Sequence, residues 1–147
     1  MAFFFSLEFL LRLRSSQEHQ EQARLQHVAQ RMHTAQARCV SLANERVELE
    51  NKFRVELEAG MAASEMYVHL AARSGLDTTE AEAKRALAEA RKQWNEQRAK
   101  FLQTRRDREV ISSIRDRQHQ EYIIQQERRE QQQIDDLFAM RRINQNG

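Results

Sequence analysis

Histidines and carboxylates are the side chains of this sequence that could hold a metal ion. The five histidines are His19, His27, His33, His69 and His119. A carboxylate-bridged site between helices requires Glu-x-x-His spacing on each of two helices, so that the ligands face inward. Only His119 follows an acidic residue, Asp116, at that spacing, and no second copy exists. We therefore expect no metal site, and we interpret this pair as part of a solvated helix face.

Nucleophilic chemistry has as little support. The single cysteine, Cys39, has no histidine or asparagine arranged to activate it, and we interpret it as a small apolar residue of a helix face. The sequence contains no glycine-rich phosphate loop, no Gly-x-Ser-x-Gly elbow and no Cys-x-x-Cys pair. A single cysteine also excludes an intramolecular disulfide and is typical of a reducing compartment. We expect no enzymatic activity and no cofactor.

The stretch of residues 99–118 is rich in arginine and is the best candidate for binding nucleic acid. Its arginines are interleaved with Asp107, Glu109 and Asp116, which offset part of their attraction for phosphate. The whole chain carries 24 basic and 22 acidic side chains, a net charge of +2. Charges of both signs at helical spacing are typical of a solvated surface. We expect no nucleic-acid partner, whereas arginine-rich faces suit protein partners.

The elements that carry these residues are predicted to be long helices. The 147 residues include no proline and only three glycines, Gly60, Gly75 and Gly147. Turns depend mostly on Gly, Pro, Asn and Asp, so the chain can reverse direction about once. The remaining composition is dominated by strong helix formers.

A heptad pattern supports this interpretation. One series recurs at seven-residue steps, interrupted only by Arg46, and consists of Leu25, Met32, Cys39 and Phe53. A companion series lies three residues later and consists of Val28, Ala35, Leu42 and Leu49. Alternating spacings of three and four place both series on one stripe of a helix, here called the seam. The sequence predicts an all-α fold, a long antiparallel two-helix coiled-coil hairpin.

We expect a single domain over residues 1–147, with one helix over about 4–60, a tip over about 61–78 and a second helix over about 79–143. Gly75 favours a turn in the tip, and Thr79 with Glu82 has the spacing of a capping box at a helix start. Both signals favour the hairpin over the alternative, a longer single helix that dimerises.

The polarity profile then predicts the register of the hairpin. Polar residues 14–24 would face about 115–121, and apolar 25–57 would face 83–114. The apolar N-terminal segment, 3–13, would meet the C-terminal apolar residues, which lie in 122–124 and 134–138.

Two apolar regions exceed what one partner helix can cover. The N-terminal stretch is apolar on nearly every side, although it is too short to span a bilayer and lacks the features of a signal peptide. The tip holds a second cluster, made of Met61, Met66, Tyr67, Val68, Leu70 and Leu76. Uncovered apolar patches mark interfaces, so both are candidate partner sites.

The two ends of the chain resemble the flagellar export protein FliJ family. At the N-terminus the similar residues are Phe5, Leu7, Leu10, Leu11 and Arg14. At the C-terminus they lie in REQQQIDDLFAMRR and include Ile134, Asp135, Asp136, Leu137, Ala139, Arg141 and Arg142. The internal Asp116-Arg117-Gln118 and the total length are also similar.

The resemblance implies a non-enzymatic stalk similar to the central stalk of rotary ATPases, located in the cytoplasm and peripheral to the inner membrane through its partners. Its paired terminal ends would bind the hexameric flagellar export ATPase through Leu7, Leu10, Leu11, Arg14, Ile134, Leu137 and Arg141. The cytoplasmic domain of the membrane export gate would contact Phe53, Leu57, Tyr67 and Leu70. Export chaperones are further implied partners.

Other functions fit the same residues. The chain could be the equivalent stalk of a virulence type III secretion system, or a structural coiled-coil adaptor that dimerises without an ATPase partner. A membrane-surface helix formed by residues 3–13 is a third alternative.

Overall fold

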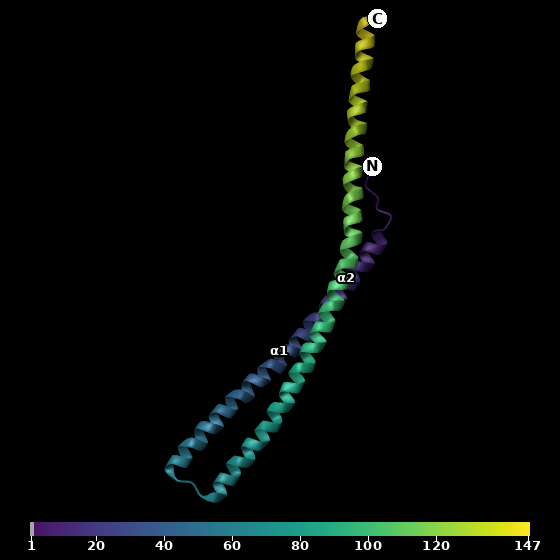
Figure 1. Ribbon diagram of the computed structural model, residues 1–147. Helices are drawn as coiled ribbons and strands as arrows, with labels where there is room; N and C mark the ends of the chain where they lie inside the picture. The colour runs from purple at the N-terminus through teal and green to yellow at the C-terminus, as the bar shows by residue number, and fades with distance from the viewer. Residues whose placement is uncertain (1) are drawn as a thin grey trace. The chain divides into compact units, whose positions relative to one another are not determined.

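The computed structural model describes residues 2–147 and contains two helices, with no strand among these residues (Figure 1). Helix α1 runs over Glu8–Ala59, 52 residues, and helix α2 over Ala63–Asn146, 84 residues. The helices pack against each other, which confirms the predicted all-α helical hairpin. None of the helices within residues 2–147 is long and apolar enough to cross a membrane.

The seam of α1 lies where the heptads predict. All eight residues of the two series are buried or half-buried, as is Arg46 at the interrupted position. Helix α2 contributes a matching stripe at seven-residue steps, made of Ala83, Ala90, Gln97, Thr104 and Ile111. Leu42, Ala83 and Ile111 are among the few buried side chains of residues 2–147. Each helix therefore buries one narrow face and exposes the rest.

The chain reverses at residues 60–62, and this corrects the predicted tip over 61–78. Gly60 has a φ of 96°, a left-handed conformation that side chains disfavour, and its N–H donates to the carbonyl of Leu57 at 3.3 Å. Gly75 and Thr79 lie inside α2, where the Thr79 hydroxyl donates to the carbonyl of Gly75 at 2.9 Å. Thr79 therefore does not begin a helix, because its hydroxyl bonds backward to the preceding turn.

The N-terminal helix also begins later than predicted, at Glu8 rather than near residue 4. The N–H of Glu8 donates to the carbonyl of Phe5 at 3.2 Å, which closes a turn before the helix. Phe5 is 4% exposed and packs in a buried cluster with Leu11 and Ile111. The non-helical start thus brings Phe5 into contact with α2.

The structure comprises two compact units. One contains the chain up to residue 19 together with 103–147, and the other contains 20–102. Each unit holds an antiparallel pair of segments from α1 and α2.

The helix pairing inside each unit corrects the predicted register. Arg14 lies 3.7 Å from Asp107, and Glu18 binds Arg108, whereas the sequence predicted partners in 115–121 for this stretch. Because the tip is centred near Gly60 rather than in 61–78, each residue of α1 meets an earlier residue of α2 than expected.

Candidate partner-binding surfaces

The N-terminal segment is divided between a packed side and an outward side. Leu11 is buried with Phe5 and Ile111, and Leu10 packs against this cluster. Phe3 stacks edge-on against His119 at 4.9 Å between ring centroids. Two of the predicted ATPase contacts, Leu10 and Leu11, thus hold the hairpin together.

The outward side of this segment carries two large rings. Phe4 is 84% exposed and Phe9 is 81% exposed, while Leu7 and Leu13 are exposed to a smaller extent. Of these four, only Leu7 is among the ATPase contacts that the family resemblance implies. The direction of each phenylalanine could not be inferred from a stretch that is apolar on nearly every side.

Arg14 is half-buried and its side chain contacts other residues of its own unit. Its Nη1 donates to the Gln17 side chain at 3.3 Å and lies 3.7 Å from an Asp107 oxygen. Its buried Nε has no hydrogen-bond partner among residues 2–147.

The C-terminal end of α2 extends beyond the last segment that α1 covers. Phe3 contacts the ring of Tyr122 at 5.5 Å between centroids, and every residue over 127–147 is exposed. The predicted pairing of 3–13 with 134–138 is therefore wrong. The register set by the turn near Gly60 leaves these later residues of α2 without a counterpart on α1.

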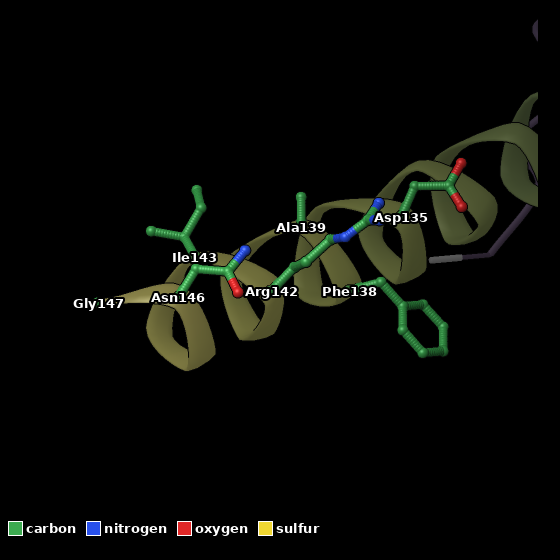
Figure 2. A pocket seen from close by; sticks show the side chains of 7 residues that line it. All are labelled: Asp135, Phe138, Ala139, Arg142, Ile143, Asn146 and Gly147. Carbon is green, nitrogen blue, oxygen red and sulfur yellow. The ribbon is translucent and has the colours of Figure 1, made fainter.

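Apolar side chains surround this exposed end on several sides. The exposed large ones are Ile134, Leu137, Phe138, Met140 and Ile143. Figure 2 shows Phe138 and Ile143 directed to different sides of the helix. Both side chains line an open hollow of about 800 Å³. Asp135, Ala139 and Arg142 also line it.

Two smaller hollows lie around the same turns. One is lined by Leu137 and Met140, and the other by Ile134, Phe138 and Arg141. The predicted contacts Ile134, Leu137 and Arg141 are thus brought together on an accessible surface, which Phe138 and Met140 enlarge.

Two charged layers interrupt the seam. The Nε of Arg108 donates to Glu18 at 2.6 Å, and its Nη2 donates to the second oxygen of Glu18 at 3.3 Å. This hydrogen-bonded arginine lowers the pKa of the Glu18 carboxyl, and the same contact raises the pKa of Arg108.

The second layer is centred on Arg46. Its Nε and Nη2 each donate to one oxygen of Glu80 at 2.9 Å, and Nη2 also donates to Asp77. The hydrogen bonds to Arg46 lower the pKa of Glu80, and those to Glu80 and Asp77 raise the pKa of Arg46. These polar layers select the register, because a slipped pairing would separate the charges.

The residues predicted to contact the export gate lie near the chain reversal. Phe53 is half-buried in the seam, where its ring lies 5.2 Å from that of His69. Leu57, Tyr67 and Leu70 are exposed, with Tyr67 the most exposed of the three. The exposed Met66 and Val68 extend this surface, whereas Met61 and Leu76 of the predicted cluster are half-buried.

Among residues 2–147, no group of three or more His, Cys, Asp and Glu side chains is arranged to hold a metal ion. His69 is engaged by Glu56, whose carboxylate lies 2.6 Å from Nε2. Cys39 is a half-buried free thiol on the seam.

Residues 3–147 match the family described as the Flagellar FliJ protein. The chain belongs to this family. The match spans nearly the whole chain and includes both terminal surfaces. Neither a curated protein nor a solved structure matches the chain.

Membership of the FliJ family associates the chain with the flagellar export machinery. The family match also confirms the resemblance inferred from the two ends of the sequence.

Proposed function

We propose that this member of the FliJ family is a non-enzymatic, cytoplasmic stalk component of the flagellar type III export apparatus. In this proposal, its terminal end binds the hexameric export ATPase. The surface that supports the proposal most strongly is the exposed end of α2, where apolar side chains lie on several sides of the same turns.

A helix that packs on one partner needs a single apolar stripe. A helix surrounded by subunits of a ring needs contacts in several directions, each of them small. Leu137 and Met140 line one hollow, Ile134, Leu137 and Phe138 line another, and Phe138 and Ile143 line a third. This distribution favours a surrounded segment over a simple two-helix contact.

The N-terminal side of the ATPase surface consists, in this proposal, of Leu7 with Phe4 and Phe9. Leu10 and Leu11 support it from inside the hairpin, because they pack with Phe5 and Ile111. Phe4 and Phe9 are the stronger candidates for direct contact, since most of each side chain is accessible.

The tip is the proposed surface for the export gate. Leu57, Tyr67 and Leu70 are exposed there, and Phe53 supports them from the seam. Export chaperones are further proposed partners along the hairpin, and attachment to the membrane would occur through the gate alone.

The ATPase surface can be tested with Leu137→Asp combined with Phe138→Asp. Both side chains are exposed, so the hairpin should fold as before. We expect at least about thirtyfold weaker binding to the purified hexameric ATPase, measured by titration, as for the loss of central apolar contacts. Val110→Asp is the matched control, because Val110 is exposed on α2 outside this surface. Equal affinity for all three proteins would contradict the proposal and favour an adaptor without an ATPase partner.

The gate surface requires a separate test. Tyr67→Asp with Leu70→Asp should abolish binding to the cytoplasmic domain of the gate protein and leave ATPase binding unchanged. If this variant lost binding to both partners, or to neither, the assignment of the two partners to different surfaces would be contradicted.

A further inference from the structure

The exposed end of α2 carries a pattern suited to pairing with itself. Over 127–147 none of the other residues that the structure describes covers the helix, since every residue there is exposed. In proteins most helical stability comes from packing an apolar face rather than from intrinsic propensity. Its large apolar side chains therefore need a covering surface whenever no other partner is bound.

The pattern has charges of opposite sign on either side of an apolar centre. Spacings of three and four connect Glu127, Glu130, Ile134, Leu137, Arg141 and Asn144, so these residues share one helix face. Ile134 and Leu137 form the centre, with Glu130 on the N-terminal side and Arg141 on the C-terminal side.

We propose that a second copy of this chain covers this face, forming an antiparallel homodimer through the C-terminal ends of α2. In a two-fold arrangement, Ile134 of each copy packs on Leu137 of the other. The same register places Glu130 of each copy against Arg141 of the other, on both sides of the apolar centre. A parallel pair would place Glu130 on Glu130 and Arg141 on Arg141, which the like charges oppose.

The charged partners are available for this contact. Within residues 2–147, neither Glu130 nor Arg141 forms an ion pair. A charged layer of this kind already occurs between α1 and α2, where Arg108 binds Glu18 at 2.6 Å. Phe138 and Met140 lie on either side of the shared face and add apolar area to the interface.

The dimer occupies the surface that is proposed to enter the ATPase ring, so pairing and ring binding would exclude each other. This consequence rests on the proposed function, whereas the dimer itself does not. Dimerisation would keep the apolar end covered until the chain meets its ring.

A charge exchange in the full chain tests the pairing without any other protein. Analytical ultracentrifugation over a wide range of concentrations should show the wild type rising from monomer to twice the monomer mass. Arg141→Glu and Glu130→Arg should each abolish this rise, because like charges then face each other on both sides of the centre. The double variant carrying both substitutions should restore it, since the ion pairs form again with reversed signs.

Arg142→Glu is the matched control. It makes the same change in charge one residue away, off the shared face, and should dimerise like the wild type. A wild type that stays monomeric at all concentrations would overturn the proposal, as would equal effects of Arg141→Glu and Arg142→Glu. Failure of the double variant to recover would overturn the antiparallel register. None of these outcomes depends on ATPase binding, which the Leu137→Asp and Phe138→Asp variant tests.

Discussion

The ion pair between Glu18 and Arg108 shows how single residues specify the alignment of two nearly featureless helices. Both side chains are largely covered, and the guanidinium binds both carboxylate oxygens. The sequence did not reveal this pair, because many arginines and acidic residues lie at helical spacing and any register offers some of them a partner.

The stability conferred by this pair should depend on pH. Because Arg108 lowers the pKa of Glu18 in the folded chain, the contribution is complete above the ordinary pKa of 4.5 and is lost as pH falls through the lower folded value. Glu18→Gln should lower the free energy of unfolding by about 0.5–1 kcal/mol near neutral pH and by almost nothing in strong acid. Thermal unfolding followed by circular dichroism measures the difference. Glu48→Gln, at an exposed position, should have no effect at any pH.

Arg46 allows a second test at this scale. Arg46→Leu completes the apolar heptad series but leaves Glu80 half-buried without its hydrogen-bonding cation, so the melting temperature should fall. Adding Glu80→Leu should recover part of the loss, because no uncompensated half-buried carboxylate then remains at position 80. A double-mutant cycle measures this coupling, and strictly additive effects would show that the two side chains act independently.

At the scale of the elements, the two internal glycines have opposite roles. Gly60 ends α1 in a left-handed conformation, whereas Gly75 lies within α2 and has open space where a Cβ would stand. In the sequence, Gly75 and the nearby capping-box spacing of Thr79 and Glu82 both predict a turn in the region of Gly75. The glycine and the capping-box spacing each act on only a few residues. The continuous burial of the seam outweighs them, so α2 continues through Gly75.

Alanine at each glycine distinguishes these roles. Gly75→Ala should raise the free energy of unfolding by about 0.5–1 kcal/mol, because glycine is a poor helix former and the added methyl meets nothing. Gly60→Ala should lower it by about 1–2 kcal/mol, the cost of a left-handed alanine. Denaturant unfolding of the two variants measures both changes. If the free energy of unfolding instead fell for Gly75→Ala and rose for Gly60→Ala, the chain reversal would lie at Gly75.

At the scale of the whole molecule, the position of the turn decides which residues become available to partners. A turn in the middle of 61–78 would have used the C-terminal apolar residues to cover the N-terminal ones. The turn at residues 60–62 instead pairs Phe3 with Tyr122 and leaves 127–147 exposed.

Removal of residues 127–147 should therefore leave the hairpin almost as stable as before. We expect the free energy of unfolding to change by less than about 0.5 kcal/mol, as for changes at exposed positions. The truncated chain should lose both ATPase binding and self-association. A large loss of stability on truncation, measured by denaturant unfolding, would mean that this end packs within the chain.

The sequence by itself determined the helical hairpin, the residues of the α1 seam and the family. These follow from composition, from the heptad period and from side chains at both ends, which are properties of the chain read along its length. Only the tertiary structure decided the turn at Gly60, the register and the separation of half-buried Leu10 and buried Leu11 from exposed Phe4, Phe9 and Phe138. Those features depend on which residues of two distant segments meet. A heptad pattern permits several alignments of similar burial, so specific contacts such as Glu18 with Arg108 select among them.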